Sequence, residues 1–418
     1  MSEPLHLFEG FGIELEYMIV DRDTLAVAPV CDKLLELVAG EPTNEIDDGP
    51  IGWSNELSLH VVELKTNGPV PKVDRTVVEA FMAGIARANA AAARLGARLL
   101  GTAMHPLMDP ATETKLWPVD EHGIYAAYDR AFDCSGHGWG NLQSCHINLP
   151  FGNAEEFGRL HAAIRPVLGL LPALAASSPL VEGKVTADLD HRLRVYSQNQ
   201  RRVPSIIGAI VPEPVTTPED YQRQILEPMY RDIAPLDPEG RLQHEWLNSR
   251  GAIARFERDA IEIRLLDVQE APVADIAIVA MVTAVVRALA EERWVGLDEL
   301  VALDTQALRG VLDAGITRAD EAVIEYVPLL RALGCDDRRL TAGEVWTSLF
   351  EQLLLRELAP HSPLREAMRT ILGHGPLAQR LVRALGHNPP PAKITAVYRE
   401  LADCLADGRM FVRHRGED

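Results

Sequence analysis

One stretch near the start of the chain decides how the sequence is read: GIELEYMIV, residues 12–20. Apolar residues alternate along it, which predicts a β-strand with one buried face. Glu14 and Glu16 then share the opposite face, about 7 Å apart along the strand. Two carboxylates on one face repel each other, and Mg²⁺, which prefers oxygen ligands, would relieve that repulsion. An isolated E-x-E is more often only the wet face of a half-buried strand, so the pair needs partners elsewhere in the chain.

The composition is that of an acidic globular protein. The 418 residues suffice for a large core and two or three domains, and 47% hydrophobic with 24% charged residues is ordinary for a soluble protein. The formal net charge of −20 argues against nucleic acid or an anionic membrane as a partner. Five cysteines without a CxxC pair predict reduced thiols rather than disulfides or structural zinc. No signal peptide is visible at the start, so we expect a cytoplasmic protein.

The order of the expected elements indicates an α+β fold rather than regular βαβ units, because long and uneven connections separate the strands. Strands are expected over residues 11–20, 57–66, 97–103, 142–150 and 260–267, and helices over 31–39, 74–95, 154–176 and 219–228. From about Val273 the strand-like alternation disappears, and helices are expected over 273–293, 297–315, 318–333, 342–358, 362–385 and 391–407. The apolar run Ile276–Val286 is too short to span a bilayer and reads as a buried helix.

A second acidic segment is NELSLHVVELKT, residues 55–66. Strict alternation puts Glu56 and Glu63 on opposite faces, because their separation is odd. Both reach one site only if a bulge lies between them or if Glu56 sits in the preceding loop. By itself the segment reads as an ordinary strand with exposed acids.

Two later strands also place polar side chains opposite an apolar face. In residues 142–149 the polar face carries Ser144, His146 and Asn148, where His146 is either a satisfied structural residue or a ligand. In AIEIRLLD, residues 260–267, Glu262 and Arg264 either pair with each other or set a metal ligand beside a donor to phosphate oxygens.

A basic cluster stands out against the acidic background, within eleven residues: Arg192, Arg194, Arg201 and Arg202. It predicts a site for an anion such as ATP or a substrate carboxylate, while a solvated charged loop is the simpler alternative. An antiparallel sheet backed by helices would gather all these polar faces on one concave surface. That surface would suit several Mg²⁺ ions around nucleotide phosphates.

In this order the segments resemble those of the glutamate–cysteine ligase family and its carboxylate–amine ligase relatives. GIELE at 12–16 is similar to the family's opening G-x-E-x-E strand, and Glu56 and Glu63 followed by Leu64-Lys65-Thr66 are similar to its second acidic strand. Three further segments resemble its G-T-x-x-H-P-like turn, its H-x-N and its S-x-S-P-x-x-x-G: LGTAMHP at 100–106, HIN at 146–148 and SSPLVEG at 177–183. IEIRLLD at 261–267 resembles the E-[VI]-R-x-L-D strand, the most specific match.

The resemblance implies the fold of the glutamine synthetase-like superfamily, a curved and largely antiparallel sheet backed by helices. It implies a catalytic domain over residues 1–272 that binds ATP and Mg²⁺, with a helical region over 273–418 packed on it. The implied metal ligands are Glu14, Glu16, Glu56, Glu63, His146 and Glu262. The predicted catalytic residues are Glu63 and Arg264, and the predicted nucleotide-binding residues are Arg194, Arg201, Arg202 and Arg264.

The implied reaction is a two-step ATP-dependent ligation. The γ-carboxylate of L-glutamate would attack the γ-phosphate to give an acyl phosphate and ADP, and an amine, in the named family that of L-cysteine, would then displace phosphate. Close relatives join other amines, so a ligase that does not use cysteine remains an alternative. A non-catalytic nucleotide-binding descendant is opposed by the retained motif acids, and a metal-dependent hydrolase by the lack of an H-E-x-x-H signature. The sequence leaves the oligomeric state open, and a homo-oligomer is one possibility.

Overall fold

The computed structural model describes residues 4–47, 49–118, 123–336 and 338–412. The outer ends of the two expected regions, residues 1–3 and 413–418, lie outside it. Its centre is an eight-stranded sheet in which the order is β2-β3-β4-β1-β6-β10-β9, β5 also pairs with β1, and every pairing is antiparallel. The expected α+β fold with a large antiparallel sheet is therefore confirmed. The strands are β1 (Gly12–Asp21), β2 (Glu45–Ile46), β3 (Ile51–Asn55), β4 (Val61–Thr66), β5 (Ala97–Leu100), β6 (Ser144–Pro150), β9 (Ala252–Arg255) and β10 (Ala260–Asp267).

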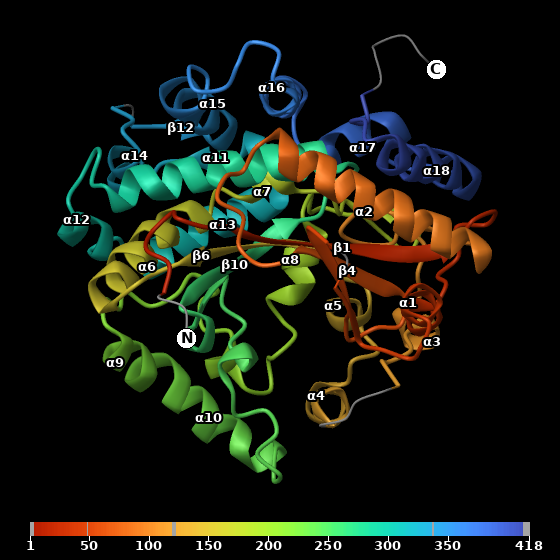
Figure 1. Ribbon diagram of the computed structural model, residues 1–418. Coiled ribbons are helices and arrows are strands. Elements are labelled where there is room, and N and C mark those ends of the chain that lie inside the picture. The colour runs from red at the N-terminus through yellow and green to blue at the C-terminus, as the bar shows by residue number, and fades with distance from the viewer. Residues whose placement is uncertain (1–3, 48, 119–122, 337, 413–418) are drawn as a thin grey trace.

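One face of the sheet is apolar and belongs to the main core. Alternate residues of β1, among them Ile13, Leu15 and Tyr17, are fully buried there. The same core contains buried faces of helices α2 (Arg75–Arg94), α6 (Ala154–Leu168) and α11 (Pro272–Ala290). In Figure 1, α2 and α11 lie on one side of the sheet, while α4 and α5 lie on the other.

Helix α11 contains the apolar run that the sequence marks as buried. It extends beyond that run at both ends, and among the described helices it is the one with the length and hydropathy to cross a membrane. Because 83% of its apolar window is buried inside the fold, it has the properties of a core helix. The expectation of a buried helix is confirmed.

Shorter helices cover the opposite, polar face: α4 (Ile124–Phe132), α5 (His137–Gly140), α8 (His191–Tyr196) and the 3₁₀ turn η4 (Glu245–Leu247). The expected helix 154–176 is two helices, α6 and α7 (Pro172–Ala175), with Pro172 beginning the second. The remaining α-helices before α11, among the described residues, are α1 (Cys31–Ala39), α3 (Pro110–Glu113), α9 (Pro218–Tyr221) and α10 (Glu227–Ile233), and the hairpin β7 (Leu180–Val181) and β8 (Lys184–Val185) precedes α8.

The last third is mainly helical, in α12 (Leu297–Val301), α13 (Thr305–Arg318), α14 (Val327–Ala332), α15 (Ala342–Leu353), α16 (Pro363–His374), α17 (Leu377–Leu385) and α18 (Pro391–Asp407). The expectation that strands end before this region is wrong at one place, because β11 (Val323–Ile324) pairs with β12 (Leu340–Thr341). A buried ion pair ties this part to the end of β10: Arg380 Nη1 lies 2.5 Å from Glu270 Oε1 and donates to the carbonyl of Phe411 at 2.6 Å.

Candidate active site

The register of β1 places acidic residues of different strands side by side. Glu16 lies opposite Glu63 of β4, and Glu14 lies between Lys65 of β4 and His146 of β6. In an antiparallel pair such directly opposed side chains share a face. Two carboxylate-rich strands therefore meet on the polar face of the sheet.

Glu56 reaches this group from the loop between β3 and β4. It follows Asn55, the last residue of β3, and β4 begins only at Val61. Carboxylate oxygens of Glu16, Glu56 and Glu63 all lie within 4.8 Å of one another. Of the two explanations for the odd Glu56–Glu63 spacing, the loop position is the one observed.

A β-bulge in β10 determines which side chains of this strand reach the site. Glu262 lies opposite Asn148 and Ile263 opposite Ile147, but the next pair is Leu266 with Cys145, so the register shifts by one residue. Arg264 and Leu265 of β10 therefore oppose one residue of β6, His146. As a result Asp267, at an odd distance from Glu262, is paired with Ser144 on the polar side of β6.

Crowding raises the proton affinity of the acidic group. Burial, followed by the negative charge of Glu14, raises the pKa of Glu63 to about 7. Burial, followed by Glu16 and Glu63, raises the pKa of Glu56 well above its usual range. Ser54 Oγ donates to Glu63 Oε1 at 2.7 Å, and Lys65 Nζ lies 3.4 Å from the same oxygen. One lysine does not compensate so many buried carboxylates.

His146 is surrounded by acids. Its Nδ1 lies 3.1 Å from Glu14 Oε2, and its Nε2 lies 2.8 Å from Ser144 Oγ, which donates to Glu16 Oε2 at 2.9 Å. Burial alone would lower the pKa of His146, but the hydrogen bond to Glu14 and the charges of Glu16 and Glu262 outweigh burial and raise it. The surrounding acids therefore favour the protonated, positively charged form of this imidazole.

Glu262 is held by two arginines instead of the other acids. Arg264 Nη2 lies 2.5 Å from Glu262 Oε1, and Arg255 Nη1 lies 3.1 Å from Glu262 Oε2. Burial would raise the pKa of Glu262, but Arg264, His146 and Arg255 lower it to about 2. Glu262 is thus ionised, and its carboxylate orients the Arg264 guanidinium on the polar face.

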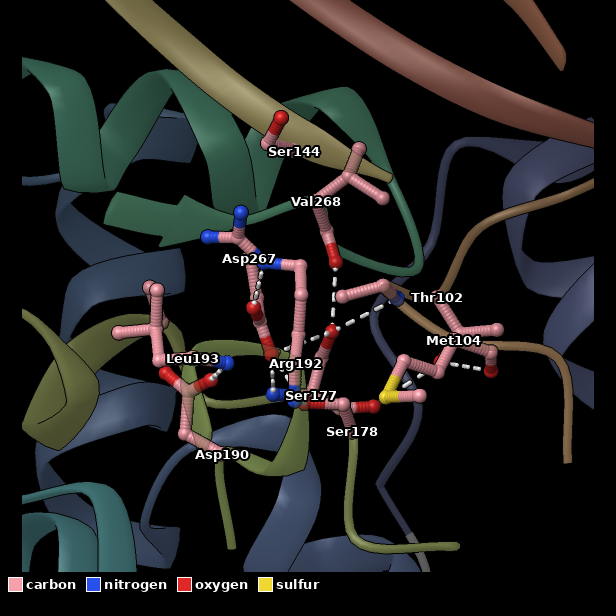
Figure 2. A network of polar contacts seen from close by, with 12 residues as sticks. Thr102, Met104, Ser144, Ser177, Ser178, Asp190, Arg192, Leu193, Asp267 and Val268 are labelled. Carbon is pink, nitrogen blue, oxygen red and sulfur yellow. Dashed lines mark hydrogen bonds and ion pairs between the residues drawn. The ribbon is translucent and has the colours of Figure 1, made fainter. Parts of the chain in front are cut away.

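A second buried network fixes Arg192 at the edge of the site (Figure 2). Arg192 Nε donates to Asp267 Oδ1, while the backbone N–H of Ser177 and the hydroxyl of Ser178 donate to Asp267 Oδ2, each at 2.8 Å. Arg192 is 2% exposed, and its Nη2 is buried without a hydrogen-bond partner among the described residues. A guanidinium in this position can receive an anionic group from the cavity that it lines.

These residues line one cavity of about 380 Å³. Seven residues predicted to form the site are in its lining: Glu14, Glu16, Glu56, Glu63, His146, Glu262 and Arg264. Across from the sheet, the lining includes aromatic side chains of α4, α5, α8 and η4. These rings, Arg255 and Asp267 are the parts that the sequence prediction missed. Arg192 belongs to the basic cluster that was predicted to bind an anion, but it was not among the predicted nucleotide-binding residues. The signals for Arg192 and Asp267 were present, in the basic cluster and in the last letter of IEIRLLD.

The other three predicted nucleotide-binding arginines lie elsewhere. None is among the described residues that line the cavity. Arg194 makes two 2.9 Å contacts with Asp188, Arg202 donates to the carbonyl of Ala131, and Arg201 is exposed. The structure therefore brings Arg192 to the site but not Arg194, Arg201 or Arg202.

The donor set fits a divalent cation. Ligand atoms of Glu14, Glu63 and His146 lie within 4.8 Å of one another, as do those of Glu16, Glu56 and Glu63. Carboxylate oxygens with a single imidazole suit a hard ion such as Mg²⁺, and a bound cation would remove the repulsion that raises the pKa of Glu56 and Glu63. Glu262 belongs to neither group of described ligand atoms.

Comparison with known proteins identifies relatives of this chain. An uncharacterised protein of Archaeoglobus fulgidus is 36% identical over 281 residues, 67% of this chain and 75% of its own. A Rubrobacter xylanophilus protein named "Putative glutamate--cysteine ligase 2-3" is 29% identical over 44% of this chain, and the match spans about half (47%) of that relative. The crystal structure of glutamate–cysteine ligase from Francisella tularensis in complex with AMP superposes with a TM-score of 0.53 at 15% identity, covering 94% of this chain and 92% of that one, which shows the shared fold.

The match to a family model is the strongest evidence for the family of this protein. The model of glutamate–cysteine ligase family 2 matches residues 10–397, which include every strand of the large sheet and almost all the C-terminal helices. Because the match runs through nearly the whole chain, this protein belongs to glutamate–cysteine ligase family 2.

Proposed function

We propose that the protein is an ATP-dependent carboxylate–amine ligase that activates its carboxylate substrate as an acyl phosphate. One observation carries the proposal: a cavity lined by four crowded glutamates, a histidine and two fixed arginines, Arg192 and Arg264. The four glutamates share Lys65 and His146 as positively charged or chargeable neighbours, so the site suits added cations together with the anionic groups they bring. Family membership supports an amide-forming ligase.

Glu14, Glu16, Glu56, Glu63 and His146 are the residues that would hold Mg²⁺. Bound there, Mg²⁺ would neutralise charge on the phosphoryl oxygens of ATP. Glu63 contributes to both groups of ligand atoms, so the predicted importance of Glu63 for catalysis follows from its shared position. The metal-ligand role predicted for Glu262 remains a prediction with its own test below.

The arginines would bind the anionic groups that react. Arg264, oriented by Glu262, would donate to the γ-phosphoryl oxygens, where negative charge builds up during transfer. Arg192, fixed by Asp267, would hold a carboxylate of the substrate. Both guanidinium groups are held before substrate arrives, so little reorganisation would be needed during the reaction.

The substrates proposed are ATP, L-glutamate and an amine. The γ-carboxylate oxygen attacks the γ-phosphorus and ADP leaves; the amine nitrogen then attacks the acyl carbon, inorganic phosphate leaves, and the nitrogen loses a proton. The acyl phosphate must be kept from water. L-Cysteine, the amine in the family's name, is the first to test.

The test is to incubate the protein with ATP, Mg²⁺ and L-glutamate, add one amine at a time, and measure ADP, phosphate and product mass. We expect amine-dependent ADP release and a γ-glutamyl amide. Glu63→Gln should lower turnover at least about 100-fold, the scale of a lost electrostatic contact in the transition state. Glu155→Gln on α6, 84% exposed, is the matched control and should be unchanged. ATP-independent turnover would indicate a hydrolase instead.

A further inference from the structure

A group of aromatic rings faces the acidic sheet across the cavity. This aromatic wall consists of Tyr125, Tyr128, Trp139, Tyr196 and Trp246, and all five line the cavity. Tyr128 lies at its centre, with ring centroids 5.2 Å from Trp139 and 5.8 Å from Trp246. The rings come from four separate elements, so only the folded chain brings them together.

Packing within the protein does not fully cover these rings. All five are only partly buried, in contrast to the fully buried Tyr17 and Trp53 of the core. Aromatic side chains left open beside a polar cavity indicate a surface for an apolar part of a ligand. Neither a phosphate, nor a metal ion, nor the carboxylate groups of glutamate would cover such a surface.

A second cavity offers space for the adenine base. This cavity, of about 840 Å³, shares Glu14, Lys65 and Arg258 with the first, so the acidic group lies where the two cavities meet. The described lining of the second cavity contains no aromatic side chain and includes Gly12, Gly52 and Gly68. Its larger volume suits a nucleoside whose phosphates reach Glu14. The smaller cavity then remains for the carboxylate and the amine.

We infer that the acceptor amine carries an aromatic ring, which packs against the aromatic wall while its nitrogen faces the acyl phosphate. This inference rests on the proposed ligase function and specifies its acceptor. The side chain of cysteine is too small to cover several rings at once. An aromatic ring buries far more area and adds the offset or edge-on ring contacts favoured between π-systems.

A panel of amines tests the acceptor class. With ATP, Mg²⁺ and L-glutamate fixed, kcat/KM is measured for L-cysteine, its isostere L-2-aminobutyrate, L-phenylalanine and 2-phenylethylamine. We expect at least one phenyl-bearing amine to exceed cysteine and aminobutyrate by about tenfold or more, the discrimination available from filling an apolar pocket. Preference for cysteine over both phenyl-bearing amines would overturn the inference.

Variants of Trp246 locate the effect. Trp246→Ala should raise the KM of the phenyl-bearing amine about tenfold and leave the KM of ATP within about twofold, because only the amine loses a contact. Trp246→Phe, which keeps a ring, should restore most of the affinity. Trp294→Ala, at the turn after α11 and outside the described lining of both cavities, is the control. A rise in the KM of ATP alone would place the base on the wall and refute the inference.

A failure of the ligase proposal can be distinguished from a failure of the inference about the aromatic acceptor. If no amine supports ADP release, calorimetric titration of the protein with 2-phenylethylamine, in the presence of ADP and Mg²⁺, reads the subsite directly. If 2-phenylethylamine binds to the wild type and not to Trp246→Ala, the aromatic subsite is supported and only the ligase reaction is rejected. If it does not bind to the wild type, the subsite and the reaction are both rejected.

Discussion

Glu16 of β1 and Glu63 of β4 are direct cross-strand neighbours, and each is only 7% exposed. Like charges directly opposite each other destabilise a sheet. Glu56 and Glu14 add to the same group. The protein therefore carries a local cost in stability that a bound cation would remove.

Mg²⁺ should stabilise the protein more at pH 8 than at pH 6. The pKa of Glu63 is about 7 in the metal-free fold, against about 4.3 in an unfolded chain, so its contribution to stability is lost as pH rises from about 4 through 7. At pH 8 the ionised carboxylates repel and bind Mg²⁺ tightly, whereas at pH 6 protons compete. Melting temperatures with and without Mg²⁺ at both pH values check this. In Glu63→Gln, the Mg²⁺-induced rise in melting temperature should differ less between pH 6 and pH 8. A rise of the same size at both pH values in the wild type would contradict the cation site.

Glu262→Gln should lower kcat without weakening Mg²⁺ binding. Both Glu262 oxygens are engaged by Arg264 and Arg255, so the variant loses the charge that orients Arg264. The expected outcome is a loss of about 100-fold in kcat with an unchanged half-saturating Mg²⁺ concentration. A large rise in that concentration would instead support the sequence prediction that Glu262 is a metal ligand.

Asp267→Asn should destabilise the fold by about 3–5 kcal/mol, because Arg192 would be left buried without its countercharge. Urea unfolding followed by circular dichroism measures the change. The control is Asp403→Asn, which breaks the partly exposed pair with Arg98 and should cost less than about 1 kcal/mol. Equal effects of the two variants would show that Arg192 does not depend on Asp267.

His161→Phe should make the protein more resistant to acid. His161 lies between the rings of Phe157 and Tyr221, each at 5.6 Å, and burial followed by the charge of Arg165 lowers its pKa to about 3. Below pH 6.5 the unfolded chain binds a proton that the fold excludes, so stability falls as pH drops towards 3. Between pH 7 and pH 4.5 the variant should lose about 2–3 kcal/mol less than the wild type in denaturant unfolding. An unchanged pH dependence would mean that His161 is protonated in the fold.

Much of the sheet could be predicted because its strands alternate strongly. The strand over 260–267 is observed with those bounds, and that over 11–20 is shifted by one residue. β3 and β9 were missed, since IGWSN contains glycine and polar residues and AIAR is only four residues long. Their strand conformation depends on pairing with β4 and β10, which a local pattern does not reveal.

The site residues also divide into those that the sequence could predict and those that it could not. All its acids except Glu56, together with His146 and Arg264, lie on alternating strands whose motifs are continuous in sequence, so pattern and resemblance found them. The aromatic wall comes from four separate elements and has no sequence signature. The density of arginines near residue 200 did not show which side chain reaches the cavity, because the neighbouring Asp188 binds Arg194 while the distant Asp267 binds Arg192.

The bulge in β10 makes the length of this strand as important as its composition. The extra residue compensates for the odd separation of Glu262 and Asp267, because two residues of β10 oppose one residue of β6. A strand of the same length paired without the bulge would turn every side chain beyond it to the other face. Asp267 would then point into the apolar core, and Arg192 would lose its anchor. A one-residue insertion in this segment therefore changes the site more than most substitutions along it.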